Sequence, residues 1–217
     1  NGQKELAEVI TGIRRIKSGQ MEYQGKDIRK DSVKERFRAG ISYISDDRHG
    51  DSLVMDMTVE DNLILRDFDR EPFSRKMVLD YRQAEKRARE ALDEYSIKTS
   101  GKSGIKTPVK LMSGGNQQKV ILSREISGEA DLIVASQPTR GLDIGATRFV
   151  HETLLRQRDA GRCVLLISAD LDEILGVSDR VAVMYEGRII GILNREEADV
   201  HKIGLLMGGI AKEAANE

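Results

Sequence analysis

The sequence contains a single cysteine, Cys163, among its 217 residues. One cysteine cannot form an internal disulfide, and this scarcity indicates a protein of a reducing compartment. Because Cys163 opens the apolar run CVLLI, we expect it to be a buried structural thiol rather than a nucleophile.

Further absences exclude other classes of protein. No run approaches the ~18 consecutive apolar residues that a membrane-spanning helix needs, and the polar start, Asn1 to Lys4, predicts no signal peptide. The formal net charge is -1, which gives no support for nucleic-acid binding. The three histidines, His49, His151 and His201, are far apart in the sequence, so they predict no metal site.

The remaining composition is that of a soluble globular protein, with 39% hydrophobic and 33% charged residues. Apolar runs alternate with helical patterns, which predicts an α/β fold. The runs DLIVA (131–135) and RCVLLIS (162–168) predict parallel strands that are covered on both faces. Helices are expected at 1–13, 32–40, 58–65, 80–97, 145–159 and near 203–206, a strand at 41–45, and hairpins at 19–28 and 180–193.

The middle of the chain is unusually rich in charged residues. Its stretch 80–97 predicts a long helix with an apolar stripe of Ala84, Ala88 and Leu92. We therefore predict a helical subdomain at 67–127 that is inserted into the α/β core. The alternative is a solvated helix that packs on the same sheet.

The stretch LMSGGNQQK (111–119) is the most specific motif of the sequence. Ser113, Gly114 and Gly115 stand just before a predicted helix. A hydroxyl, two bare backbone N–H groups and a helix N-terminus together form a site for an anion. The alternative is a Ser-Gly helix cap that binds no ligand.

This motif is followed by QPTRGLD and then by LLISADLDEI. The order resembles the nucleotide-binding domains of ABC transporters, in which an LSGGQ signature precedes a Walker B strand, a D-loop and a switch histidine. GISYISDDRHGDSLVMDMTVEDNLIL is similar to the Q-loop region of that family, so the resemblance covers nearly the whole chain. The match is closest to the second, C-terminal domain of tandem ATPase subunits, which serve bacterial importers of simple sugars or nucleosides. The stretches LMSGGNQQK, QPTRGLDIGA and YEGRIIG together favour the nucleoside or basic-membrane-lipoprotein type of importer.

The resemblance implies an α/β, P-loop NTPase-like core with a parallel sheet and an inserted helical subdomain. Residues 1–217 would form one nucleotide-binding domain, and we expect its N-terminal strand or strands to lie outside this chain. The implied cofactors are ATP and Mg²⁺. The implied partners are a second nucleotide-binding domain, transmembrane permease subunits and, indirectly, a substrate-binding lipoprotein. The implied location is peripheral, on the cytoplasmic face of a bacterial cell membrane.

The phosphate cradle of the family reads G-x-x-x-x-G-K-[ST]. Asn1 and Gly2 match its end, and the Lys and Ser/Thr positions hold Gln3 and Lys4. A glutamine offers a phosphate no charge. Lys4 is displaced by one residue, which rotates it by about 100° on a helix, although its long stem can reach back. With the following Glu5, these residues are the candidates for the phosphate side.

The metal and water positions of the family have also changed. Its Walker B strand ends in Asp-Glu, and the matching residues are Ser136 and Gln137. A glutamine cannot act as the general base, which typically contributes a factor of ~10²–10⁴ to the rate. Ala169 stands at the switch-histidine position and Asp46 at the Q-loop glutamine. We therefore expect no catalytic residue and no metal ligand in this half of the site.

The signature and the D-loop keep their chemistry in Ser113, Gly114, Gly115, Asn116 and Asp143. In the family, two domains pack head to tail, and each ATP lies between the Walker residues of one domain and the signature of the other. We therefore expect this domain to complete the ATP site of its partner while its own site is inactive.

Two alternatives stay open at this point. The first is an active ATPase that uses Lys4 and a water network at Gln137. The second is an ABC-type ATPase without a membrane partner, although the helical insertion is short for that class. The candidate contact with a membrane subunit is 45–62, and its alternative is an ordinary polar loop with two apolar anchors, Leu53 and Val54.

Overall fold

A parallel three-stranded sheet forms the centre of the computed structural model, in the order β3-β6-β7. Its strands are β3 (Ile41–Ile44), β6 (Leu132–Ser136) and β7 (Cys163–Ile167). The prediction of parallel strands in an α/β fold is confirmed. The structure describes residues 1–99, 101–126 and 130–210.

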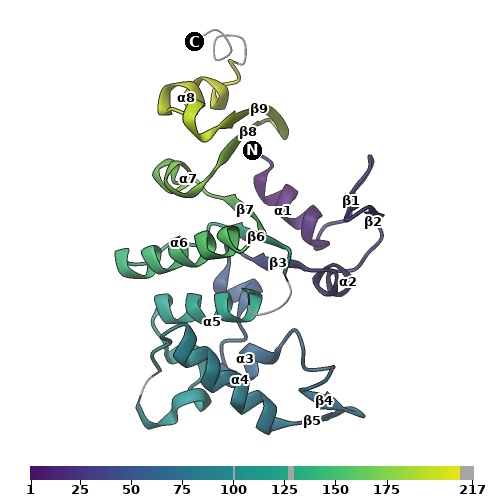
Figure 1. Ribbon diagram of the computed structural model, residues 1–217, viewed down its shortest axis with the longest axis vertical. Coiled ribbons are helices and arrows are strands. Elements are labelled where there is room, and N and C mark those ends of the chain that lie inside the picture. Colours follow the sequence, from purple (N-terminus) through teal and green to yellow (C-terminus); the bar gives the residue numbers. More distant parts are fainter. Residues whose placement is uncertain (100, 127–129, 211–217) are drawn as a thin grey trace.

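Helices cover both faces of this sheet (Figure 1). Alternate side chains of a strand point to opposite faces. On one face, Ile41, Tyr43 and Val134 belong to the same buried cluster as Ala7 of α1 (Gln3–Thr11). On the other face lie two longer helices, α5 (Gly114–Ile126) and α6 (Ile144–Asp159).

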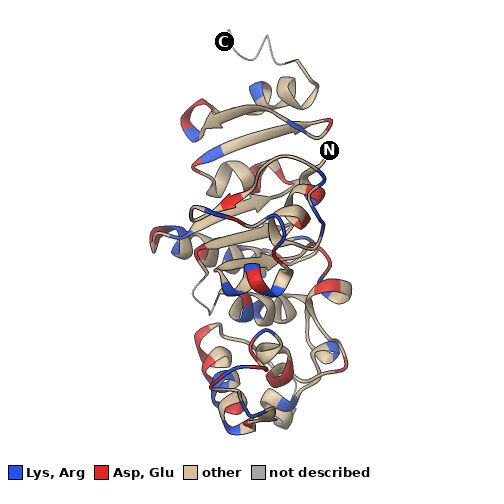
Figure 2. Ribbon diagram, turned by 90° about the vertical axis from the view of Figure 1, so that its right-hand side faces the viewer, with Lys and Arg blue, Asp and Glu red and all other residues tan. Residues whose placement is uncertain are grey.

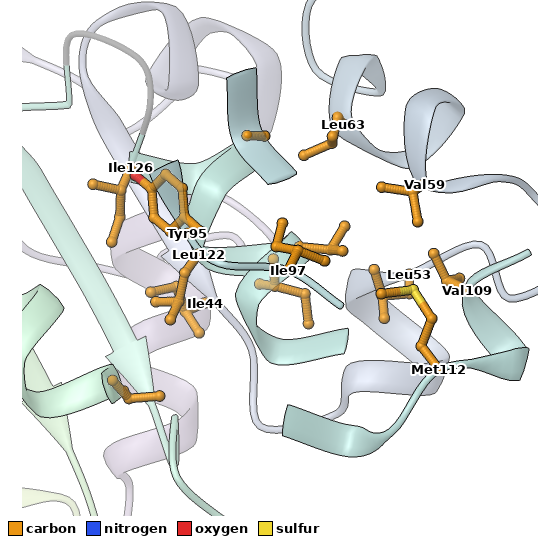
Figure 3. Close-up of a cluster of buried hydrophobic side chains, with 14 of the residues drawn as sticks. Ile44, Leu53, Val59, Leu63, Tyr95, Ile97, Val109, Met112, Leu122 and Ile126 are labelled. Atoms are coloured by element: carbon orange, nitrogen blue, oxygen red, sulfur yellow. The ribbon is translucent and has the colours of Figure 1, made fainter. Parts of the chain in front are cut away.

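A helical layer packs on the side of α5 that faces away from the sheet. It consists of α3 (Val59–Ile64) and α4 (Tyr81–Glu94), and α3 contacts both α4 and α5. Figure 3 shows part of the shared core, in which Leu53, Val109 and Met112 lie together. The predicted apolar stripe of α4 holds, since Ala84 and Ala88 are buried together with Ala91, and Leu92 is partly buried.

The boundaries 67–127 of the predicted subdomain stay a prediction. Its last residue, Ser127, lies outside the described residues. One continuous apolar cluster contains Ile44 and Ala135 of the sheet as well as Val59 and Ala88 of the helical layer. The helical layer and the sheet therefore share a core.

The C-terminal part forms a second, smaller apolar cluster. The hairpin of β8 (Arg180–Tyr185) and β9 (Arg188–Asn194) turns at Glu186 and Gly187, as predicted. Both turn residues have positive φ, as a two-residue turn of this kind requires. The hairpin packs against α7 (Leu171–Val177) and α8 (Val200–Met207).

Shorter elements complete the chain. The predicted edge hairpin (β1 and β2) and the short helix that follows it (α2) are both present. The hairpin of β4 and β5 was not predicted. These elements are β1 (Glu22–Tyr23), β2 (Lys26–Asp27), α2 (Val33–Arg38), β4 (Ser74–Arg75), β5 (Val78–Leu79), the π turn η1 (Arg48–Ser52) and the 3-10 turns η2 (Gly101–Lys106), η3 (Val109–Leu111) and η4 (Arg195–Glu197).

The expectation of a buried thiol is wrong, because Cys163 is exposed. Cys163 is the first residue of β7, which among the described residues pairs only with β6. β7 is accordingly less buried than β6, so only β6 fits the prediction of a strand covered on both faces. An apolar run in the sequence does not reveal whether its strand has one neighbour or two.

Charges of both signs are distributed along the whole length of the molecule (Figure 2). This mixture agrees with the formal net charge of -1. Within the part of the chain that the structure describes, no helix has the length and apolar character needed to cross a membrane.

Candidate functional site

The carboxyl ends of the three parallel strands place three polar segments at one edge of the sheet. In the strand register Ile44 lies opposite Ala135, and Ser136 lies opposite Ile167. The residues that follow the three strands, 45–46, 137 and 168–169, therefore leave the sheet side by side. Ligands of open α/β sheets bind at this edge, outside the carboxyl ends of the strands.

Gln137 is held in an unusual backbone conformation at this edge. Its φ is 48°, a value that few residues other than glycine adopt. Its N–H donates to the carbonyl oxygen of Ile167 at 2.7 Å, and its own carbonyl accepts from Arg140 N–H at 3.1 Å. Such strain costs about 1–3 kcal/mol and is concentrated at functional sites. Ser136, just before it, is buried.

Lys4 and Asp46 form an ion pair, with Nζ and Oδ1 3.6 Å apart. The charge of Asp46 is the main cause that raises the pKa of Lys4. Gly2 caps the start of α1, and Gln3 and Glu5 are exposed in its first turn. The positive charge of Lys4 is therefore already neutralised by the carboxylate of Asp46.

The end of β6 offers no carboxylate to a magnesium ion, and the carboxylate of Asp46 at the same edge is paired with Lys4. Ser136 and Gln137 offer a hydroxyl and an amide oxygen, whereas Mg²⁺ is usually bound through carboxylates. Ala169 is exposed and brings only a methyl group. Among the residues that the structure describes, no three His, Cys, Asp or Glu side chains gather in a way that could hold a metal ion.

Residues 113–116, here called the signature turn, orient a serine hydroxyl at the start of α5. Asn116 Nδ2 donates to Ser113 Oγ at 2.9 Å, and Asn116 Oδ1 accepts from Lys98 N–H at 2.8 Å. Because Ser113 Oγ accepts this bond, its own proton can donate to an external acceptor. Ser113 is exposed, and the first N–H groups of a helix lack intrahelical partners. These groups together fit an anionic ligand.

The signature turn packs directly against the start of α6. Asp143 caps that helix, and its Oδ1 accepts from Ala146 N–H at 2.8 Å. A Cβ atom added to Gly115 would lie 3.0 Å from the Ala146 side chain and 3.9 Å from Asp143 Oδ2. Glycine is therefore the residue that lets the two segments approach this closely.

The site residues thus form two clusters. The phosphate-side cluster consists of Gly2, Gln3, Lys4, Glu5, Asp46, Ser136, Gln137 and Ala169. The signature cluster consists of Ser113, Gly114, Gly115, Asn116 and Asp143.

Sequence reasoning missed Arg48 as a residue that links the signature cluster to the loop after β6. Arg48 donates to the carbonyl oxygen of Arg140 at 2.9 Å, in the loop that follows β6. Sequence analysis placed Arg48 only within the candidate contact 45–62. A bond to a backbone carbonyl places no demand on the type of the accepting residue, so no sequence pattern could have revealed it.

The candidate contact segment is only partly anchored. Leu53 is buried in the main core, whereas Val54 is 42% exposed. The alternative, a polar loop with two apolar anchors, therefore fits Leu53 and is wrong for Val54. Whether this segment contacts a membrane subunit stays a prediction.

Comparison with known proteins agrees with this geometry. Residues 2–140 match the model of the ABC transporter family. The guanosine import ATP-binding protein NupO of Bacillus subtilis is 43% identical over 217 residues, which are 100% of this chain and 42% of NupO. The nucleoside import ATP-binding protein NupA of Lactococcus lactis is 41% identical, covering 96% of this chain and 41% of NupA. The glucose import ATP-binding protein TsgD13 of Haloferax volcanii is 40% identical, covering 96% of this chain and 38% of TsgD13.

Solved structures share the fold. A nucleotide-free ATP-binding cassette from an ABC transporter superposes with a TM-score of 0.73 at 24% identity, covering 90% of this chain and 77% of that cassette. The dimeric post-hydrolysis state of the cassette MJ0796 bound to ADP and Pi superposes with a TM-score of 0.72 at 18% identity, covering 89% of this chain and 81% of that cassette. The chain spans about two fifths of the length of the curated relatives it matches. The chain has the P-loop ABC ATPase fold and belongs to the ABC transporter family.

Proposed function

We propose that this chain is a nucleotide-binding domain of a bacterial importer, and that it completes the ATP site of a partner domain. The observation that carries the proposal is the contrast between the two clusters. The signature cluster has an exposed hydroxyl at the N-terminus of α5, held by Asn116 so that its proton can be donated. The phosphate-side cluster pairs Lys4 with Asp46 and has no carboxylate at Ser136 or Gln137.

The phosphate-side cluster is poorly suited to hydrolysis. A triphosphate would have to compete with Asp46 for Lys4, and like charges at such short range repel. Gln137 is isosteric with glutamate but cannot take a proton from water. ATP and Mg²⁺ would therefore be held mainly by the Walker residues of the partner domain.

The signature cluster has the character of a protein interface. Leu111 is 60% exposed and Ile144 is 89% exposed, and they flank Ser113 and Asp143. Large apolar side chains on the surface beside polar, functional groups are typical of protein–protein contacts. We infer that a second nucleotide-binding domain covers this surface, with Ser113 directed at the γ-phosphate and Asp143 at the seam.

The names of the relatives indicate the class of compound that is transported. The relatives at 43% and 41% identity import guanosine and nucleosides, whereas the glucose and ribose importers are 40% and 36% identical. We therefore favour nucleosides over simple sugars. The permease subunits and the substrate-binding lipoprotein would select the compound, and this domain would lie on the cytoplasmic face of the membrane.

We place the chain as the second, C-terminal domain of a tandem ATPase subunit, with 1–217 as one domain and a helical subdomain at 67–127. The curated relatives are more than twice as long as this chain, which leaves room for another domain of equal size.

Transport-linked ATP hydrolysis by the full subunit in its membrane complex tests the proposal. Ser113→Arg should abolish turnover, because a long cation would fill the signature turn that faces the partner's ATP. Gln137→Glu should change turnover little, because it restores only the general base. The positions of the phosphate-binding lysine, the metal-linked aspartate and the switch histidine would still be changed. Ser18→Arg, at an exposed loop position, is the matched control for the introduced side chain. Normal turnover in Ser113→Arg would overturn the proposal.

A second candidate is an active site built on Lys4, and one observation favours it. α1 does bring Lys4 to within 3.6 Å of Asp46, which follows β3 at the edge where nucleotides bind in this fold. Under this candidate Lys4→Ala would lower turnover strongly, whereas our proposal expects nearly unchanged turnover. Failure to co-purify with membrane subunits would instead favour an ABC-type ATPase without a membrane partner.

A further inference from the structure

The segment between β3 and α3 begins with a rigid turn. Asp47 caps η1 by accepting the N–H groups of His49 at 3.1 Å and Gly50 at 2.8 Å. The bond from Gly50 is the main cause that lowers the pKa of Asp47. Leu53 N–H donates to the Arg48 carbonyl oxygen at 2.9 Å and closes the turn. The backbone of the turn therefore fixes the points from which the Arg48 and His49 side chains leave it.

Arg48 reaches two loops that carry groups of the proposed ATP-facing surface. Its guanidinium donates to the carbonyl oxygen of Arg140 at 2.9 Å and to that of Gly114 at 3.5 Å. Among the described residues it forms no ion pair, and burial alone lowers its pKa. A Cβ atom on Gly141 would lie 3.4 Å from the guanidinium, so the glycine leaves it room.

His49 holds the same turn from a second point. Its Nε2 lies 3.0 Å from Gln117 Oε1, and Gln117 Nε2 donates to the carbonyl oxygen of Val109 at 3.0 Å. Gln117 is buried one helical turn after Gly114. Arg48 therefore contacts the start of α5 at Gly114, and His49 contacts the same helix one turn later at Gln117.

We propose that Arg48 and His49 are positioning residues that couple the phosphate-side cluster to the signature turn and to the loop that leads to Asp143. Asp46 pairs with Lys4 and lies only two residues before Arg48, so the backbone joins the phosphate-side cluster directly to the residue that contacts both loops. This inference rests on the proposed function, because it assumes that the signature turn acts on the partner's ATP.

The test uses the full subunit in its membrane complex, with the variants Arg48→Ala, Arg48→Lys and His49→Ala. Lysine keeps the charge but cannot bridge two carbonyls with a planar fork. Arg48→Ala should lower kcat for ATP at least about tenfold with little change in KM, since the positioned turn acts only when the domains close. His49→Ala should show a smaller loss, and Arg48→Lys should fail to rescue. Arg89→Ala removes an exposed ion pair on α4 and serves as the matched control.

Amide hydrogen exchange gives a readout that does not depend on hydrolysis. Arg48→Ala should accelerate exchange at 113–117 and 140–143 together, whereas Arg89→Ala should leave both segments unchanged. In the parent subunit Asp46→Asn should alter exchange at 113–117, and Arg48→Ala should abolish that response. Parent-like exchange and parent-like kcat in Arg48→Ala would overturn the inference. If Ser113→Arg turns over normally while the exchange result holds, the proposed function fails but the coupling stands.

Discussion

At the scale of single residues, our proposal depends on a few side chains at one edge of the sheet. Ser136, Gln137 and Ala169 bring neither a carboxylate nor an imidazole to this edge, and its one carboxylate in 45–46, Asp46, is paired with Lys4. The backbone at Gln137 has a strained conformation of the kind that is concentrated at functional sites.

The pair of Lys4 and Asp46 allows a prediction of pH behaviour. The pKa of Lys4 is raised in the folded protein, so the contribution of the pair is fully present below the ordinary lysine pKa and is lost as pH rises through the raised pKa. Asp46→Asn should return the pKa of Lys4 towards its ordinary value, as measured by NMR titration of the Lys4 side chain. Asp69→Asn, which removes the partner of Lys34, is the control and should not move Lys4. An unchanged Lys4 titration in Asp46→Asn would contradict the pairing.

At the scale of elements, capping decides where helices begin. Thr58 and Asp61 form a reciprocal box at the start of α3, in which Thr58 Oγ1 accepts from Asp61 N–H at 3.1 Å and Asp61 Oδ2 accepts from Thr58 N–H at 3.2 Å. The motif T-x-x-D before an apolar run announces this start in the sequence. α3 then joins α4 to α5, so its start matters for the position of the signature helix.

Thr58→Ala should lower the free energy of unfolding by about 1 kcal/mol, because one helix N–H group loses its acceptor. Urea denaturation of the full subunit measures the loss, and amide exchange of 59–64 localises it. Thr58→Ser keeps the hydroxyl and should retain most of the stability. An equal loss in both variants would show that the methyl group, and not the cap, is responsible.

At the scale of the whole molecule, a buried charge network joins the sheet, the helical layer and η1. Glu125 of α5 is fully buried between Arg66, which follows α3, and Arg124. Arg124 donates to the carbonyl oxygen of Ser52 at 2.7 Å, and Ser42 of β3 donates to that of Glu125 at 2.5 Å. The signature helix is therefore tied to the sheet at its far end, and to η1 and the start of α6 at the signature turn.

Glu125→Ala should destabilise the protein by about 3–5 kcal/mol, because it leaves two arginines without their buried partner. The decrease in the urea midpoint of unfolding measures this effect. The surface pair of Arg148 and Glu152 supplies the control, since Glu152→Ala should cost at most about 1 kcal/mol. Similar losses in the two variants would contradict the structural role of the buried network.

The sequence by itself determined most of the helices and strands and the order of the motifs. Strand and helix periodicity, the cap at Thr58 and the turn at Glu186 and Gly187 are local features, so they can be recognised without the fold. The motif order from LMSGGNQQK to LLISADLDEI carried the family. The fold class followed from both, and it is confirmed by the ABC cassette structures.

Only the tertiary structure decided which side chains meet. Lys4 and Asp46 are 42 residues apart in sequence, and Arg48 and Arg140 are separated by 92 residues. Such contacts depend on the strand order, and a bond to a carbonyl requires no particular residue type. Cys163 is exposed for the same reason, because its apolar run does not specify how many strands lie beside β7. The sequence gives the types of side chain that a site can use. Their positions relative to one another depend on the parallel strands, which bring distant segments to one edge of the sheet.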